Sequence, residues 1–493
     1  MQPETRNYDL VIVGAGPAGL TAALQADKAG LHVAVVDEQA ASGGQIFRQP
    51  PATFKAPLSS AFTSYPFGKE LLEQARSNTR IQWYYSSIAW GVFHPVKGGV
   101  QLAIFQQEQT YLLEGRKLLI ATGAYDLPVA LPGWTLPGVM SAGGVQTLLK
   151  SQFLCSAQRY VLAGSHPLLL LLAEQLLDAG VQIQEIAIAR PRPQLREILA
   201  GWRALPDHWR LFFQLTGIFF KLWHKRVPLR FSTLLTRVEG KDRVERVTLT
   251  DVDSCWAPIP DTERSLKVDG VAIGYGLLAS TELARQAGCQ VNWQPERGGW
   301  VVKHDEEMRT SMEHIYVAGE PAGVSGAEVA HCQGQLAALS IIALLKSDAA
   351  TEVVAARRAL RRAQPFADTV AAFFAPRLDA LARLATNETL ICRCEDVTAG
   401  QVSEFLQAHP HVTSINSVKL ACRSGMGPCQ GRYCQHTVAH LVAAERDIAV
   451  NQTGIYTAQA PIKPIPLTSL VSNQPESPLP TDKNQNMIMR QKP

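Results

Sequence analysis

The 493-residue sequence predicts an α/β protein in which two βαβ units with parallel strands precede a small C-terminal domain that carries paired cysteines. Three observations support this class. A short apolar strand, a glycine turn and a helix of small residues open the chain, and a second strand–helix–strand pattern begins at residue 159. Five of the nine cysteines lie between Cys392 and Cys434. At roughly 150 residues per domain, the length allows about three domains.

The first unit contains a glycine turn of the nucleotide-binding type. Gly14, Gly16 and Gly19 satisfy G-x-G-x-x-G between a strand over residues 8–13 and a helix over residues 20–29. The first glycine permits the tight turn, the second lets a pyrophosphate approach the backbone, and the third lets helix and strand pack closely. Amides at the start of such a helix bind phosphate oxygens.

An acidic residue ends the next strand, over residues 31–37. Asp37 can accept hydrogen bonds from ribose hydroxyls, and Glu38 is the alternative acceptor. A glycine motif alone is weak evidence, because a chance glycine turn also matches it. Its position inside a complete βαβ unit predicts a dinucleotide site.

Two later strands end in short turns that suit the same site. Residues 117–123 end in Ala-Thr-Gly, residues 310–320 end in Gly-Glu, and a helix over residues 327–339 follows the second turn. Each segment alone fits any α/β sheet, but their joint order is hard to obtain by chance. The candidate residues in these segments are Thr122, Gly123, Gly319, Glu320 and Ala327.

This order resembles the two-dinucleotide-domain flavoprotein oxidoreductases. In that family, the Ala-Thr-Gly turn passes beside bound FAD, and an acidic residue after Ala-Gly holds the ribityl chain. Glu320 stands where the family usually has Asp. The loop with Gly44 and Gln45 looks like the one that lines the isoalloxazine, and the amino end of the 327–339 helix would face the flavin pyrimidine edge.

The second unit lacks the features of a nicotinamide site. Its turn keeps Gly164, but His166 and Leu169 stand at the second and third glycine positions, and its second strand ends at Arg190 without a carboxylate. A side chain at the second position obstructs the approach of a pyrophosphate. We therefore expect no ordinary NAD(P)H binding here, and interpret the unit as a retained scaffold or a site for another nucleotide.

The cysteine-bearing module provides four thiols as two close pairs, Cys392 with Cys394 and Cys429 with Cys434. Iron–sulfur clusters need such soft anionic ligands, and nearby glycines permit tight turns whose amides point at sulfur. Zinc is the alternative, although its ligand pairs usually have two to four intervening residues. Cys422 is either a spare thiol or a further candidate ligand.

The runs CRCEDVTAGQV and KLACRSGMGPCQGRYC resemble the [2Fe-2S] domain of the bacterioferritin-associated ferredoxin type. Joined to a flavoprotein, they resemble the FAD/[2Fe-2S] subunits of opine oxidases, hydrogen cyanide synthases and related amino-acid and hydroxyproline dehydrogenases. The resemblance implies that the four paired cysteines bind the cluster. It also implies a partner subunit with its own FAD, similar to D-amino-acid oxidase, and a small ferredoxin-like subunit. This chain would relay electrons to a membrane carrier.

The expected domains follow from these assignments. They are an FAD-binding domain of residues 1–129 and 269–345, an inserted second domain of 130–268, a helical connector of 346–386 broken by Pro365 and Pro376, a [2Fe-2S] domain of 387–449 and an extension of 450–493, disordered from about 472.

Composition excludes several other classes of protein. A net charge of +4 spread along the chain is too small for a nucleic-acid partner. We see no secretory leader and expect a cytoplasmic protein, and no apolar run reaches the roughly 18 residues of a membrane span. Membrane contact would then be peripheral. Two alternative functions stay open: a stand-alone NAD(P)H-dependent ferredoxin or nitrite-type reductase, and a non-catalytic scaffold subunit.

Overall fold

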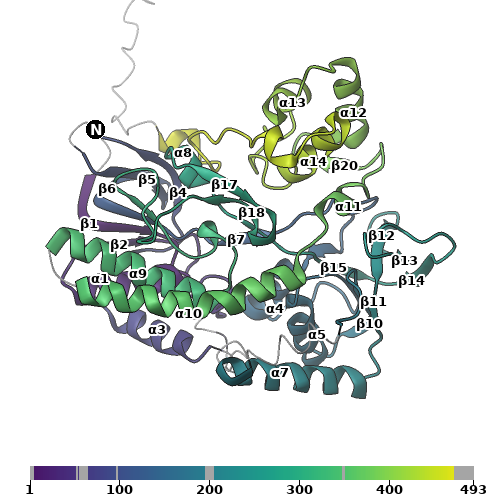
Figure 1. The fold of residues 1–493 in the computed structure, drawn as a ribbon, viewed down its shortest axis with the longest axis horizontal. Helices are drawn as coiled ribbons and strands as arrows, with labels where there is room; N and C mark the ends of the chain where they lie inside the picture. Colours follow the sequence, from purple (N-terminus) through teal and green to yellow (C-terminus); the bar gives the residue numbers. More distant parts are fainter. Residues whose placement is uncertain are drawn as a thin grey trace, which may run out of the picture.

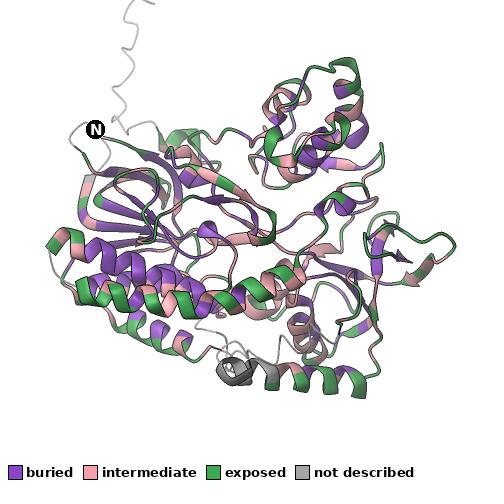
Figure 2. Cartoon of the chain, viewed as in Figure 1, coloured by how far each residue is buried: buried purple, intermediate pink, exposed green. Residues whose placement is uncertain are grey.

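The computed structural model describes residues 5–51, 54, 65–95, 98–194, 205–346 and 350–470, without the side chains of Thr5 and residues 205–212. Two domains built on β-sheets lie side by side, and a small helical domain sits above them (Figure 1). Buried side chains concentrate in the two sheets and on the helix faces turned toward them (Figure 2). The predicted disorder from about residue 472 lies outside the described residues.

The first domain is a seven-stranded sheet with the order β3-β2-β1-β6-β5-β4, and β19 pairs with β6. Strands β1, β2, β3, β6 and β19 are parallel, while β4 and β5 form an antiparallel edge. The strand β2 is buried along its whole length, as its continuous Val and Ala run requires. The elements are β1 (Thr5–Val13), α1 (Pro17–Lys28), β2 (Val33–Val36), α3 (Phe67–Ser77), β3 (Gln82–Tyr84), β4 (Ile88–Phe93), β5 (Val100–Gln106), β6 (Gln109–Ile120) and β19 (Ile315–Val317).

One long helix completes this domain. Helix α9 (Ala327–Lys346) packs on α1, and Gly334 of α9 lies where an added Cβ would be 2.8 Å from the Ala18 Cα. By length and composition α9 could cross a membrane, although no apolar run of that length was expected from the sequence. However, 61% of its apolar window is buried inside the protein. It is the core helix of this domain.

The second domain has a five-stranded parallel sheet with the order β11-β10-β9-β15-β8. Strand β15 pairs with both β9 and β8, so the inserted domain reaches Gly274 and the predicted boundary at residue 268 is too early. A short apolar strand has the same sequence pattern in either sheet, so the sequence alone does not show which sheet it joins. The elements are β8 (Val139–Ser141), α4 (Ala142–Gln152), β9 (Arg159–Gly164), α5 (Leu168–Asp178), β10 (Gln182–Ile188), α7 (Leu205–His224), β11 (Leu229–Phe231) and β15 (Gly270–Gly274).

Smaller sheets flank and join the two domains. Strands β7 (Ala124–Asp126) and β16 (Leu277–Ala279) pair antiparallel where the chain leaves the first domain and returns to it. The other small sheets are β12 (Thr233–Glu239), β13 (Arg246–Asp251) and β14 (Arg264–Lys267), and β17 (Val291–Gln294) with β18 (Gly299–Val302). The short helix α8 (Glu282–Gln286) follows β16.

The connector differs from its prediction at one proline. Helix α10 (Ala350–Phe374) continues through Pro365 and packs along α9, so the predicted break there is wrong. A proline removes one backbone hydrogen bond. The packing on α9 keeps the helix intact. Pro376 does end the helical run, and α11 (Leu378–Ala382) follows it.

The C-terminal domain is mainly helical. Helix α12 begins with a capping box in which Thr398 and Gln401 exchange hydrogen bonds, one of the strongest local start signals. After α14 the chain returns to the first domain, where the Ile462 amide donates to the Trp90 carbonyl and Lys463 pairs with Glu38. The elements are β20 (Leu390–Cys392), β21 (Val397–Thr398), α12 (Ala399–Ala408), α13 (Ile415–Cys422) and α14 (Gln435–Arg446), with 3-10 turns η3 (Val450–Thr453) and η4 (Leu467–Ser469).

Candidate functional site

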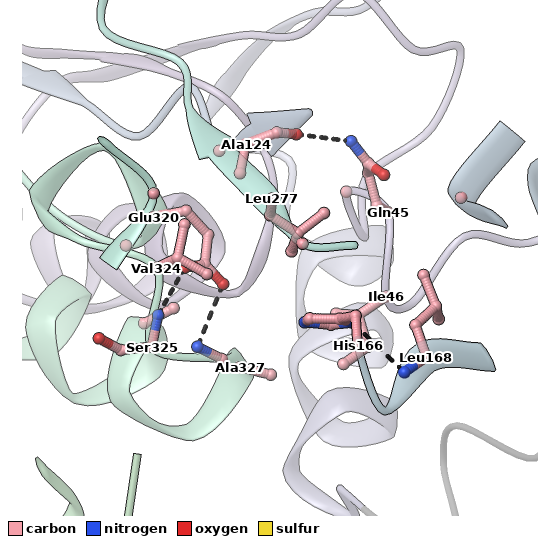
Figure 3. A pocket seen from close by; sticks show the side chains of 18 of the residues that line it. Gln45, Ile46, Ala124, His166, Leu168, Leu277, Glu320, Val324, Ser325 and Ala327 are labelled. Atoms are coloured by element: carbon pink, nitrogen blue, oxygen red, sulfur yellow. Dashed lines mark hydrogen bonds between the residues drawn. The ribbon is translucent and has the colours of Figure 1, made fainter. Parts of the chain in front are cut away.

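One cavity of about 1640 Å³ runs between the two large domains. Every residue predicted to bind the dinucleotide lines this cavity except Gly19. Segments that are far apart in the sequence therefore meet as the joint order of the motifs predicted. Figure 3 shows Gln45 and Ala124 on one side of the space, Glu320 with Ser325 on another, and His166 facing them.

The glycine turn is close-packed in the way the motif requires. Gly14 has φ +106°, and a Cβ there would lie 2.8 Å from the Ala121 carbonyl carbon. At Gly19 a Cβ would lie 3.0 Å from the Gly14 carbonyl carbon, so Gly19 packs helix on strand and does not face the cavity. Gly16 instead meets only the Gly44 Cα within 4 Å, which leaves room beside its backbone for a phosphate.

The carboxylate at the end of β2 holds the glycine turn. Asp37 Oδ2 accepts a hydrogen bond of 2.6 Å from the Ala15 amide, and Oδ1 accepts one of 2.7 Å from the Gln39 amide. Burial raises the pKa of Asp37, and these two amides oppose that shift. Glu38 also lines the cavity, but it pairs with Lys463. Asp37 is therefore the better placed ribose acceptor of the two.

Two cations that no sequence motif predicted also line this cavity. Burial lowers the pKa of Arg48, and the nearby Asp37 carboxylate opposes the shift. Burial, assisted by the Arg48 charge, lowers the pKa of Lys150 to about 8. Cations at these positions suit the phosphates of a dinucleotide. Nothing in the local sequence marks them, because α4 brings Lys150 from the second domain.

The flavin end of the cavity is built by β7 and its neighbours. Gln45 Nε2 donates to the Ala124 carbonyl at 2.9 Å, and Thr122 Oγ1 donates to the Ser280 carbonyl at 2.7 Å. Gly123 has φ +74° and open space around it. These contacts fix the loop that the resemblance to flavoproteins assigns to the isoalloxazine and the Ala-Thr-Gly turn that it places beside FAD.

Glu320 occupies the amino end of α9. Its carboxylate accepts a hydrogen bond of 2.8 Å from the Ser325 amide and one of 3.2 Å from the Gly326 amide. Burial raises the pKa of Glu320 to about 7, although both amides oppose the shift. Ala327 begins the helix beside it. The longer side chain of Glu thus reaches the helix start, where it is placed to meet both the amides and the cofactor.

The turn of the second nucleotide fold carries a histidine where the motif has its second glycine. His166 Nδ1 accepts a hydrogen bond of 3.3 Å from the Leu168 amide, and burial lowers its pKa to about 4. The Arg190 guanidinium lies over the Phe373 ring of α10 at 3.4 Å from the ring centroid. Ser165 Oγ donates to the Phe374 carbonyl at 3.4 Å. The end of α10 therefore packs against this loop, and the loop and Phe373 both line the cavity.

The four predicted cluster ligands come together as two pairs. Cys392 is hydrogen bonded to Cys434, and Cys394 to Cys429. The bond from Cys434, together with the Gly425, Glu395 and Cys394 amides, lowers the pKa of Cys392 to about 5 despite its burial. Within the described ranges, no three or more His, Cys, Asp or Glu side chains are arranged tightly enough to hold a single metal ion. A donor set of thiols fits a cluster with more than one iron.

The loops around these cysteines leave room only for glycine. A Cβ at Gly427 would lie 3.4 Å from the Cys394 Cα and closer still to its Cβ, and Gly425 and Gly431 have φ of +82° and +87°. Cys422 lies apart, at the end of α13, where burial raises its pKa.

The C-terminal domain is fixed to both large domains. Trp134 Nε1 donates to the Leu390 carbonyl at 2.6 Å, and the Arg393 guanidinium lies over the Trp134 ring. On the other side, Arg432 of the C-terminal domain pairs with Glu282 of the first domain at 3.7 Å. Arg432 belongs to the KLACRSGMGPCQGRYC run, but that motif indicates cluster binding and gave no sign of a contact with Glu282.

Comparison with known proteins agrees with this geometry. A family model described as pyridine nucleotide-disulphide oxidoreductase matches residues 8–202 and 218–335, and one described as BFD-like [2Fe-2S] binding domain matches residues 390–444. The chain belongs to the pyridine nucleotide-disulphide oxidoreductase family and carries a BFD-like [2Fe-2S] domain. It is an FAD-dependent oxidoreductase, and FAD and a [2Fe-2S] cluster are its cofactors.

Relatives that share both parts narrow the family further. An opine oxidase subunit of Rhizobium meliloti is 34% identical over 94% of this chain and 87% of its own length. Hydrogen cyanide synthase subunit HcnB of Pseudomonas aeruginosa is 30% identical over 94% and 98%. The chain thus belongs to the family that contains these two subunits, as the motifs predicted. L-proline dehydrogenase from P. horikoshii has the same fold, with a TM-score of 0.70 and 20% identity over 96% of this chain and 81% of its own.

Proposed function

We propose that this chain is the electron-transfer subunit of a heteromeric amino-acid or opine dehydrogenase. A partner subunit would oxidise the substrate, and this chain would take up the electrons on FAD and pass them singly to the [2Fe-2S] cluster. A flavin accepts two electrons at once and releases them one at a time, whereas the cluster handles one. The proposal rests on one observation: the cluster-binding loop reaches the wall of the flavin cavity through Arg432.

The residues of the chain would bind and orient the two groups. The glycine turn and Asp37 would hold the adenosine half of FAD, while Arg48 and Lys150 would face its phosphates. Gln45, Thr122 and Glu320 would surround the flavin half. Cys392, Cys394, Cys429 and Cys434 would hold the cluster.

Partner subunits are part of the proposal, because the relatives at 30–34% identity are themselves named as subunits. We propose an FAD-containing partner similar to D-amino-acid oxidase and a small ferredoxin-like third subunit. The electrons would continue to a respiratory acceptor. The chain would work in the cytoplasm, with any contact to the inner membrane being peripheral.

The altered turn of the second nucleotide fold argues against the NAD(P)H-dependent reductase. His166 replaces the second glycine, and the Arg190 guanidinium at the end of the second strand lies against the Phe373 ring. An NADH-dependent enzyme needs that loop for the pyrophosphate. The cavity and its cofactor loops argue against the non-catalytic scaffold, which would not need them.

The deciding experiment is anaerobic purification of the tagged chain from its native host. Co-purifying subunits would be identified, and visible and electron paramagnetic resonance spectra recorded before and after addition of amino acids and opines. Substrate should bleach the flavin and produce the signal of a reduced cluster only when the partner is present. Bleaching by NADH alone would support the reductase instead, and a colourless preparation would support the scaffold.

A further inference from the structure

A short series of polar side chains crosses the boundary between the cluster domain and the first domain. Arg432 lies in the loop between Cys429 and Cys434 and donates to the Cys429 carbonyl at 3.0 Å. Its Nε atom is 3.7 Å from a carboxylate oxygen of Glu282, at the start of α8. The Tyr125 hydroxyl, on β7, donates to that same oxygen at 3.3 Å. We name Arg432, Glu282 and Tyr125 the interdomain link.

The link is shielded from water. The side chains of Arg432 and Glu282 are 15% and 6% exposed. Burial raises the pKa of Tyr125 far above its usual value, so its hydroxyl keeps its proton and serves as a donor. A second donor, Ser280 Oγ, holds the other Glu282 oxygen at 3.1 Å. At 3.7 Å the two side chains form an ion pair without a direct hydrogen bond, and other groups hold each of them: the Cys429 carbonyl holds Arg432, and Tyr125 and Ser280 hold Glu282.

Both ends of the link meet a cofactor site. Arg432 and Tyr125 line the cavity described above, and Tyr125 follows Ala124, whose carbonyl holds Gln45 of the flavin loop. At the other end, the carbonyl that Arg432 binds belongs to a cluster ligand. Arg432 therefore touches the wall of one site and the backbone of the other.

We propose that the interdomain link is the electron-transfer contact between the two cofactors, with Arg432 as its positioning residue. This inference rests on the proposed function. The ion pair with Glu282 fixes the separation of the cluster loop and the flavin cavity, and electron transfer slows steeply as two centres move apart. The positive guanidinium at the cavity wall would also favour the negative charge that reduction adds on the flavin side of the cavity.

Electrons and protons balance in the transfer from the flavin to the cluster. With both groups bound, the flavin would supply two electrons and one proton in each turnover. Each electron would pass singly to the cluster and on to a one-electron acceptor outside the chain, and the proton would be released to water. The link provides contact and charge, and forms or breaks no covalent bond.

The test uses the full chain loaded with both cofactors and four variants. Arg432→Gln removes the charge, Arg432→Lys keeps the charge but loses the two-sided contact, and Glu282→Gln removes the partner with little change in shape. Arg423→Gln is the matched control, because Arg423 is an arginine of the same domain that pairs with Glu395 and does not line the cavity. Flavin absorbance and iron content establish that each variant carries both groups.

Laser-flash reduction of the flavin with 5-deazaflavin then gives the rate at which the cluster becomes reduced. We expect Arg432→Gln and Glu282→Gln to lower that rate about tenfold or more, with Arg432→Lys between them and the wild type and Arg423→Gln unchanged. We also expect Arg432→Gln to make the flavin midpoint potential more negative, which loss of a merely structural contact would not do.

Unchanged transfer rates in both Arg432→Gln and Glu282→Gln would overturn the proposal. So would loss of iron or flavin from both variants, because the link would then be a folding element. If only Arg432→Gln loses its cluster, the rate of cluster reduction in the nearly isosteric Glu282→Gln decides whether the proposal holds. Absence of transfer in the wild type would instead refute the proposed function, so the two failures can be told apart.

Discussion

The contact between α1 and α9 offers a direct test of how the FAD site is held. The amino ends of these helices provide the glycine turn and the Glu320 region, so their spacing sets the spacing of the two ends of the cofactor. Gly334 is the point of closest approach. A Cβ there would lie 2.8 Å from both the Cα and the carbonyl carbon of Ala18, and closer still to its carbonyl oxygen. Gly334→Ala must therefore push the helices apart.

The size of the effect follows from two opposing terms. Alanine is favoured over glycine inside a helix by about 1 kcal/mol. Overpacking a buried contact costs about 1–3 kcal/mol, and a clash with backbone belongs at the upper end. We expect a net loss of about 2 kcal/mol. Gly217, within α7, is the matched control, because it is exposed and a Cβ there meets nothing within 4 Å. Gly217→Ala should stabilise by about 1 kcal/mol.

Release of FAD on heating, followed by flavin fluorescence, measures the first domain without requiring the whole chain to unfold in one step. At about 2–4 °C for each kcal/mol in a domain of this size, Gly334→Ala should lower the release temperature by about 4–8 °C. Gly217→Ala should leave it unchanged or slightly raised. If both variants released FAD at the same temperature, the close approach of α1 and α9 would not control the site.

Three further outcomes are expected. Cys422→Ser should keep the iron content and visible spectrum of the wild type, whereas Cys429→Ser should lose the cluster; equal retention of iron in both would refute the ligand assignment. Glu320 has a folded pKa of about 7 against an ordinary value of 4.5, so its contribution to apoprotein stability is full below pH 4.5 and is lost as the pH rises through about 7. Thermal unfolding across that range should show this fall, and Glu320→Gln should flatten it. NADH should not bleach the flavin near about 450 nm in the wild type or in His166→Gly, because the strand after the turn still ends at Arg190 without a carboxylate for the ribose; anaerobic titration would show any bleaching.

Local patterns predicted the parts of the site that depend on backbone geometry. The glycine turn, Asp37 and the four cysteines each sit in a short motif whose chemistry follows from residue type and spacing. Strand–turn order then predicted that Thr122 and Glu320 would meet them. These are the features that a parallel sheet fixes once its strand order is set.

Contacts between domains could not be predicted in this way. Lys150 reaches the cavity from α4, and Arg432 reaches it from the cluster domain, each from a distant part of the sequence. The boundary at residue 268 was placed too early for the same reason, because the sequence of a short apolar strand such as β15 does not show which strands it pairs with. At Pro365, tertiary packing on α9 outweighed the local preference for a break.

The segment after α14 gives the cluster domain a second attachment. The domain enters from α11 and leaves through residues 450–470, which bind the first domain through Trp90 and Glu38, while the Arg432 guanidinium also donates to the Ile462 carbonyl. A module tethered at both ends cannot swing on a single hinge as a mobile carrier arm does. A redox partner that takes electrons from the cluster must therefore bind to the domain where it is fixed, and Cys394 is the exposed member of the four predicted cluster ligands.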